Sequence, residues 1–366
     1  MKRKFIIFLT AIITAACAVL SGCSCAGCSG DETLAFSSAF SGGNKPSANY
    51  TETLNYSVEY SADYLSNFKK DAGLDQFFTF EYEEGYYGSD FKIALPSELA
   101  EIKSDIKSDI TVYKFTTMFS VKLKFLTLNG AACDYEHEET IKTSAYIAAA
   151  DMSFAPIYTE EESQYCVISV SGDKTEISVE ESTNTTLYNK DEYIKTLTYR
   201  EYKIDEQNID GIKPKTKTDT IDYDFRSVID NAELLFALRG VSLAEEDNTV
   251  IPVVSAAYND PTPLKITNVK RASENMTISY VKNGVPTVID DKPITYNTLE
   301  YRKNTTNAAG WAQSVKIQAK AAGDNGELDN LALPIKFAKP LFVYSGGNVV
   351  KMGSLVFTLT EVYVNN

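Results

Sequence analysis

His137 is the only histidine of the chain, and it lies among carboxylates in the stretch Tyr135-Glu136-His137-Glu138-Glu139. An imidazole beside carboxylates can bind zinc, copper or nickel, and it is also the base that a Ser-His-Asp hydrolase needs. Alternation along a strand, however, places His137 on the face opposite Glu136 and Glu138. We therefore interpret this stretch as a solvated acidic turn, and we expect neither a metal site nor catalysis there.

Other residues that could do chemistry are not arranged in a recognisable catalytic pattern. The sequence has no Gly-x-Ser-x-Gly elbow, phosphate loop or dinucleotide fingerprint, and no spacing singles out a glycosidase-like acid pair. The stretch from Gly323 to Asp329 has oxygen ligands but departs from the calcium-loop spacing, so we expect a surface hairpin. Arg239 could orient an acidic ligand group, but we favour an interaction with nearby helix carbonyls. We expect no enzymatic activity and no cofactor.

Four cysteines beyond the first twenty-three residues have to be assigned. Cys25 and Cys28 have the spacing of a redox pair or of half a zinc site, but no matching second pair is visible, so we interpret them as part of a flexible leader. Cys133 and Cys166 lie in the body of the chain. They either form a disulfide, which would stabilise the fold by about 3–4 kcal/mol, or remain as two buried free thiols.

The N-terminus has the layout of a secretory signal peptide. Met1-Lys2-Arg3-Lys4 is positively charged, and the run from Phe5 to Leu20 is apolar apart from two threonines. This run is short for a membrane-spanning helix and lacks the flanks of a stop-transfer segment, so we expect it to be removed.

The stretch Leu20-Ser21-Gly22-Cys23 resembles the lipobox of bacterial lipoproteins. The resemblance implies cleavage after Gly22 and a diacylglyceryl thioether on Cys23, with acyl chains such as palmitate inserted in the membrane. Such chains contribute about 0.8 kcal/mol per buried methylene, so two of them anchor a protein stably. An ordinary signal peptide that happens to contain a cysteine is the alternative. We expect an exported protein held at the outer face of the cell membrane or in the cell envelope.

The acidity of the chain limits its partners. The formal charge of −15 becomes −18 when Lys2, Arg3 and Lys4 leave with the signal. Such a body repels phosphate backbones and anionic headgroups, so we expect no nucleic-acid partner, and the acyl anchor rather than charge must hold the protein to the membrane. The sequence does not point to any particular protein partner.

Composition and patterning divide the chain into three parts. Residues 1–22 are the predicted signal peptide, and residues 23–49, rich in Ser, Gly and Ala, are a predicted flexible tether. Residues 50–366 form the predicted β-rich domain, in which the polar stretch 205–220 is the one tolerable internal boundary. The many tyrosines and phenylalanines suit half-buried strands.

Alternating apolar residues predict most of the body to be strand. The predicted strands cover residues 54–60, 78–82, 91–93, 113–125, 140–150, 165–171, 174–180, 193–202, 250–257, 264–270, 276–282, 285–290, 294–302, 312–320, 334–343 and 354–364. Asn129-Gly130, Gly172-Asp173 and Asn283-Gly284 are predicted hairpin turns. The prolines at 252, 286, 334 and 340 are expected at edges or strand ends.

Two helices are predicted among the strands. The first begins at Pro96 and continues to Ile110, with isoleucines close to one face. The second has Asp224 as its N-cap and Gly240 in the C′ position. Its apolar residues occupy more than one face, with Leu235 and Phe236 on one side and Leu234 and Leu238 on another, so we expect it to be wedged against a sheet and covered elsewhere.

Three local patterns occur in order along the body. They run from Thr143-Ser144-Ala145-Tyr146 to the Pro156 step and Glu160, from Asp224 through Arg239, and from Leu333-Pro334 to Phe357. Together they resemble a family of exported bacterial β-proteins, a domain of unknown function. The resemblance implies an acidic turn after Pro156 and a curved antiparallel sheet holding one helix, the half-barrel of lipid and lipoprotein carriers. With the strand pattern, it predicts a mainly β fold: a strongly curved antiparallel sheet or half-barrel with one packed helix and a second short helix.

Two functions from different classes are compatible with this organisation. A non-catalytic carrier of an apolar or lipid-like ligand should have a deep cavity lined by Phe, Leu and Tyr between the sheet and the second helix. A structural or adhesive envelope module should have a filled core and exposed tyrosines that bind a protein or glycan.

Overall fold

The computed structural model describes most of the predicted body. The described residues are 5–8, 49–61, 78–102, 111–150, 153–171, 174–189, 192–222, 228–241, 243–255, 261–303, 313–319, 328, 331–345 and 348–366. Cys23, the Cys25/Cys28 pair, the tether to residue 48, the Gly172-Asp173 turn and the Asp224 cap lie outside them. So does the Gly323–Asp329 stretch, apart from Leu328.

Sixteen strands of the described chain belong to one sheet. They are β1 (Phe5–Phe8), β2 (Thr51–Ser61), β3 (Phe78–Ile93), β4 (Val112–Leu128), β5 (Ala131–Ala150), β6 (Ser153–Ser171), β7 (Lys174–Tyr188), β8 (Glu192–Lys203), β9 (Lys215–Asp222), β10 (Ile229–Asp230), β11 (Asn248–Val254), β12 (Thr262–Lys282), β13 (Val285–Lys303), β14 (Gln313–Gln318), β15 (Pro334–Ser345) and β16 (Asn348–Asn365). The order across the sheet is β10-β11-β12-β13-β14-β15-β16-β2-β3-β4-β5-β6-β7-β8-β9, with β1 paired to β6.

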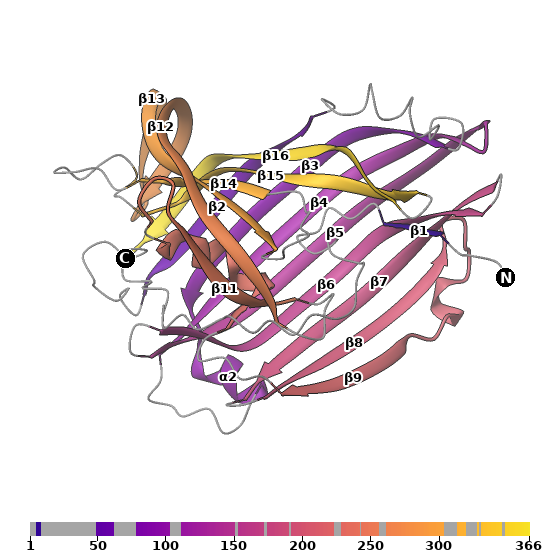
Figure 1. Ribbon diagram of the computed structural model, residues 1–366, viewed down its shortest axis with the longest axis horizontal. Helices are drawn as coiled ribbons and strands as arrows, with labels where there is room; N and C mark the ends of the chain where they lie inside the picture. Colours follow the sequence, from indigo (N-terminus) through magenta and orange to yellow (C-terminus); the bar gives the residue numbers. More distant parts are fainter. Residues whose placement is uncertain are drawn as a thin grey trace.

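The sheet is a mainly antiparallel half-barrel in which the strands at one end close into a ring. From β2 to β9 each strand pairs with the next along the chain, and Figure 1 shows these strands as a broad slanted array. At the other end β12 also pairs with β16 in parallel, between residues 279–282 and 361–364, which closes the strands from β12 to β16 into a ring. The prediction of a mainly β, strongly curved sheet is therefore confirmed, and strands on both sides of 205–220 share that one sheet.

Two predicted hairpin turns have the backbone that their sequences require. Asn129 and Gly130 have φ values of 54° and 75°, and Asn283 and Gly284 have φ values of 51° and 77°. A two-residue turn with positive φ at both positions is the type that matches the twist of the flanking strands. The Asn-Gly pairs thus set the registers of β4 with β5 and of β12 with β13.

Several predicted interruptions do not exist. Residues 78–93 form one strand despite Gly85, where a Cβ would lie only 3.0 Å from Val58 Cγ1, so the glycine admits a neighbouring side chain. β12 and β13 also run through their predicted gaps and absorb the irregularity as register shifts. The predicted acidic turn at Glu160 lies inside β6, opposite β5 and β7.

The polar stretch at 205–220, predicted as the one tolerable internal boundary, leads into the edge strand β9. Its residues are mostly exposed because β9 pairs only with β8 among the described strands. An edge strand that is solvated in this way loses the apolar alternation by which strands are found in a sequence.

Both predicted helices are present, with altered boundaries. α2 (Pro96–Ile102) begins at the predicted proline; the rest of its predicted length, residues 103–110, lies outside the described chain. The second is irregular: η5 (Asn231–Glu233), α3 (Leu234–Ala237) and η6 (Leu238–Gly240) follow one another. We call residues 231–240 the helical segment. None of the described helices is long and apolar enough to cross a membrane.

The helical segment is capped differently from the prediction. Its cap is Asp230, which accepts from the N–H of Ala232, while Glu233 accepts from the N–H of Asp230. Gly240 ends the segment without positive φ, because a tight bond from Val241 N–H to the Leu238 carbonyl closes the last turn. Every residue from 233 to 240 is buried, which confirms that this over-apolar segment is packed on several sides.

Aromatic side chains join the helical segment to the inner face of the sheet. Phe236 stacks on Phe91 of β3 with ring centroids 4.9 Å apart and contacts Phe115 of β4. On the other side of the core, Phe337 of β15 stacks on Phe357 of β16 with centroids 4.5 Å apart. Packing of this kind fixes the segment against the sheet and positions the pocket described next.

Candidate functional site

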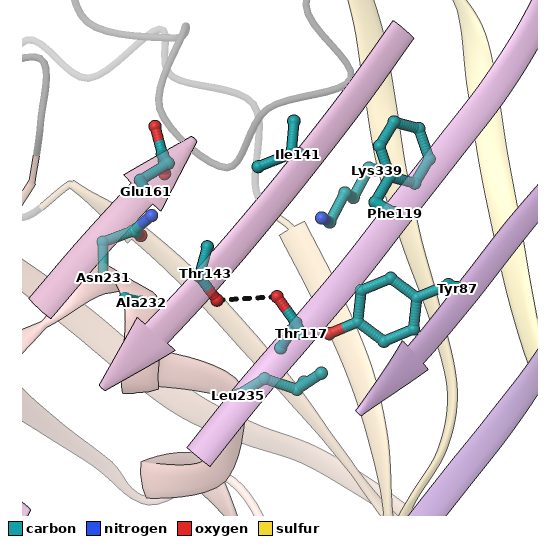
Figure 2. Close-up of a pocket in the computed structure, with 10 residues that line it drawn as sticks. All are labelled: Tyr87, Thr117, Phe119, Ile141, Thr143, Glu161, Asn231, Ala232, Leu235 and Lys339. Carbon is teal, nitrogen blue, oxygen red and sulfur yellow. Dashed lines mark hydrogen bonds between the residues drawn. The ribbon is translucent and has the colours of Figure 1, made fainter. Parts of the chain in front are cut away.

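A small pocket lies between the inner face of the sheet and the helical segment (Figure 2). The residues lining it come from β3, β4, β5, β6, β15 and the helical segment: Tyr87, Thr117, Phe119, Ile141, Thr143, Glu161, Asn231, Ala232, Leu235 and Lys339. Its volume of about 30 Å³ has room for about two water molecules. The pocket combines apolar walls with several polar groups that point into it.

Lys339 of β15 is a buried cation at this pocket. Its residue is 6% exposed, and its Nζ lies 5.4, 5.6 and 5.5 Å from the ring centroids of Tyr87, Phe119 and Phe357. The faces of such rings attract an ammonium group. Burial nevertheless lowers the pKa of Lys339 to about 8, against the opposing effect of the Glu161 carboxylate. Figure 2 shows the ammonium pointing into the pocket.

Glu161 of β6 lies on the opposite side of the pocket, next to Asn231 (Figure 2). Burial raises its pKa to about 7, and the negative charge of Asp230 acts in the same direction. The positive charges of Lys339 and Lys195 act against this rise. The pocket thus has an acid on one side and a base on the other, each with its pKa moved toward neutrality.

Hydroxyl groups and aliphatic side chains line the pocket between these two ionisable groups. Thr117 of β4 and Thr143 of β5 are joined by a hydrogen bond of 2.7 Å between their Oγ1 atoms. Ile141 and Leu235 supply apolar surface from the sheet and from the helical segment. Polar and apolar surface are thus both available within one pocket.

Close to Glu161, a buried hydrogen-bond network around Asp230 holds the start of the helical segment. The Asp230 carboxylate accepts hydrogen bonds from Thr159 at 2.9 Å, from Tyr188 and from the backbone of Ala232. Burial raises the pKa of Asp230, and these hydrogen bonds oppose the rise. Lys195 donates to the carbonyl of Ser255 at 2.7 Å. We assign this network a structural role, because its polar groups find their hydrogen-bond partners inside the fold.

Arg239 has a different partner from the one predicted. Its guanidinium binds the Glu52 carboxylate of β2 through two hydrogen bonds of 2.6 and 3.0 Å and donates to the Leu331 carbonyl at 2.9 Å. Both charged side chains are buried. Neither a ligand nor the helix carbonyls are needed to explain Arg239; it ties the end of the helical segment to the beginning of the folded body.

His137 lies in the middle of β5 and is buried, so the prediction of a solvated turn is wrong. The alternation argument is confirmed: Glu136 and Glu138 are exposed, while His137 faces inward and is 7% exposed. Its Nε2 has no hydrogen-bond partner, and burial lowers its pKa to about 4. No cluster of three metal-binding side chains is present in the described part of the chain.

Cys133 and Cys166 are free thiols in the structure. Cys166 is buried, and the half-buried Cys133 donates from Sγ to the Phe125 carbonyl at 3.4 Å. When the pairing of β5 with β6 is extended, Cys133 falls five residues from the position opposite Cys166. That offset is about 16 Å along a strand, far beyond the Cα separation that a disulfide spans.

Two residues of the pocket were missed by the sequence analysis, although each leaves a signal. Lys339 follows Ile335 and Phe337 on the buried face of a predicted strand, where a charge is anomalous. Glu161 is the middle member of three consecutive glutamates, which made it look like part of a solvated turn. Both residues line one pocket because β15 and β6 face each other across the interior, and no local sequence pattern reveals that arrangement.

A search of solved structures finds a weak resemblance to the crystal structure of a beta-barrel-like protein of the Domain of Unknown Function DUF1849 from Brucella abortus. The match covers 87% of this chain and 98% of that chain, with a TM-score of 0.38 and 8% sequence identity. No family model and no curated protein matches the chain. Its function must therefore be inferred from its own residues.

Proposed function

We propose that the chain is a non-catalytic lipoprotein of the cell envelope, anchored to the membrane through Cys23, whose half-barrel binds an apolar or lipid-like ligand. The pocket between the inner sheet face and the helical segment is the observation that carries the ligand-binding part. The order of charged residues, apolar run and Leu20-Ser21-Gly22-Cys23 supports export and anchoring.

The walls of the pocket offer an apolar chain contacts from two sides. Ile141 and Phe119 project from the sheet, and Leu235 projects from the helical segment. Because the volume of about 30 Å³ admits only about two waters, a chain can enter only if side chains such as Leu235 move aside. The backbone is held at both ends of the segment by Asp230 and Arg239, so the adjustment falls on side chains.

Binding of a fluorescent fatty-acid analogue tests this proposal. The protein to use is the mature chain from residue 23 with Cys23→Ser, so that no acyl group of its own competes. Leu235→Arg places a charge in the pocket and should abolish binding. Leu95→Arg is the matched control, because Leu95 is 58% exposed next to α2 and should tolerate the change.

Leu235→Gln, which is closer in volume, is a milder second variant, and circular dichroism checks that each variant is folded. Equal binding by the Leu235 variants and the unsubstituted protein would contradict the proposal.

A structural or adhesive envelope module is the second candidate, and the small volume of the pocket favours it. Tyr86 and Tyr363 are 45% and 38% exposed on the outer sheet face, where Asn55 and Glu361 connect them through hydrogen bonds. Aromatic side chains of this kind can bind a protein or glycan. Loss of a captured partner in Tyr86→Ala and Tyr363→Ala, without any fatty-acid binding by the unsubstituted protein, would select this candidate.

A further inference from the structure

Lys339 lines the pocket, and its residue is 6% exposed. Its Nζ makes no hydrogen bond or salt bridge with any residue in the described part of the chain, although it has three N–H donors. A buried ammonium is costly unless an anion or hydrogen-bond acceptors compensate it. The position therefore lacks the compensation that Arg239 obtains from Glu52.

The aromatic rings around Lys339 offset only part of the free-energy cost of burying its ammonium group. Tyr87, Phe119 and Phe357 present ring faces to the ammonium, which stabilise its charge. Ring faces are weak substitutes for oxygen acceptors, however, and the ammonium points away from β15 into the pocket. The donors of Lys339 are thus directed at the space that a ligand would occupy.

Glu161 acts on Lys339 only through space, without a salt bridge between them. It lines the same pocket, but on the opposite side, and the structure has no ion pair between Glu161 and Lys339. Its own pKa is raised to about 7, which also weakens its charge at neutral pH. An anion that enters the pocket would meet Lys339 directly, with the hydroxyls of Thr117 and Thr143 beside it.

We propose that the ligand of this pocket is an anionic amphiphile whose carboxylate or phosphate oxygens accept hydrogen bonds from Lys339 Nζ. Its apolar chain contacts Ile141 and Leu235. This inference rests on the proposed ligand-binding function and adds the charge of the headgroup to it. Carboxylate and phosphate share the relevant chemistry, a compact anion with oxygen acceptors, which an ammonium binds as a point charge.

Calorimetric titration of the mature Cys23→Ser protein distinguishes the contribution of the ligand's headgroup to binding from that of its apolar chain. The three probes are decanoate, decanol and inorganic phosphate, which represent an anion with a chain, a chain without an anion and an anion without a chain. Lys339→Met removes the charge at similar length, and Lys336→Met is the matched control on the outer face of β15. A charge-assisted hydrogen bond predicts at least about tenfold tighter binding of decanoate than of decanol.

In Lys339→Met, the affinity for decanoate should fall to that for decanol, while the affinity for decanol stays unchanged and shows that the pocket is intact. Lys336→Met should bind all probes like the unsubstituted protein. Equal affinities for decanoate and decanol, or undiminished decanoate binding by Lys339→Met, would contradict the proposal of an anionic headgroup. The proposal that the pocket binds a lipid-like ligand would not be affected by that result. Phosphate binding that depends on Lys339, without any binding of either ten-carbon probe, would overturn the lipid-like ligand instead. Failure of all three probes to bind would overturn both.

Discussion

Lys339 and His137 are both basic side chains on inward-facing strand positions, and burial lowers the pKa of each. Their surroundings differ. Lys339 has three aromatic rings and an adjoining pocket, whereas the Nε2 of His137 has neither a partner nor a place in that pocket. The proposed ligand binding therefore involves Lys339, whereas we treat His137 as a neutral residue of the core.

The buried His137 should make the stability of the fold depend on pH. Its pKa is about 4 in the folded chain against 6.5 in the unfolded chain. Between these values the unfolded chain binds a proton that the folded chain does not, so the free energy of unfolding falls as pH is lowered. The full effect is about 3 kcal/mol, present above pH 6.5 and lost toward pH 4.

Urea denaturation at several pH values measures this effect against His137→Phe, which keeps a ring but cannot bind a proton. Because the chain has a single histidine, the difference between the two proteins isolates its titration from that of the carboxylates. Parallel curves for the two proteins from pH 7 to pH 4 would show that His137 is not buried in the neutral form.

At the scale of the elements, period-two alternation predicted nearly every strand, because one face of each strand packs inward. The alternation pattern failed to predict strands where close packing or solvent exposure determined the residue types instead. Gly85 accommodates the side chain of Val58 inside β3, and β9 is polar because it is an edge strand. Asp230 caps the helical segment in a capping box that the sequence analysis did not recognise. The pocket itself could not be predicted, since it depends on which distant strands share the interior.

The Arg239–Glu52 pair should be a principal link between the helical segment and β2. Removing one partner, in Arg239→Met or Glu52→Met, leaves a buried charge without compensation and should lower the free energy of unfolding by about 3–5 kcal/mol. The double variant should lose less than either single variant, since no isolated charge remains. Chemical denaturation of all four proteins measures the coupling; single variants that each lose less than about 1 kcal/mol would contradict a strong link.

For the whole molecule, the described body begins in the interior of the sheet, between β16 and β3. The body begins with Tyr50 and β2, whose first residues pair with the end of β16. β1, which lies in the predicted signal peptide, pairs with residues 167–170 of β6, so cleavage after Gly22 would remove that partner from β6. The acidic body disfavours anions at long range, and recruitment of an anionic amphiphile must depend on the local charge of Lys339.

Substitution of Cys23 tests the anchor independently of the pocket. In Cys23→Ser the thioether cannot form, so we expect unprocessed precursor to accumulate and the acylated mature form to disappear. Metabolic labelling with radioactive palmitate, followed by membrane fractionation, measures both. Normal processing with unchanged membrane association of the mature Cys23→Ser protein would contradict the lipoprotein assignment.

Mass spectrometry of molecules extracted from the purified mature Cys23→Ser chain tests ligand binding most directly, because it does not assume which ligand is bound. The account predicts one class of anionic amphiphile in near-stoichiometric amount, retained by Leu95→Arg and lost from Leu235→Arg and Lys339→Met. Extraction of no such molecule, or of the same molecules in the same amounts from all of these variants, would contradict it.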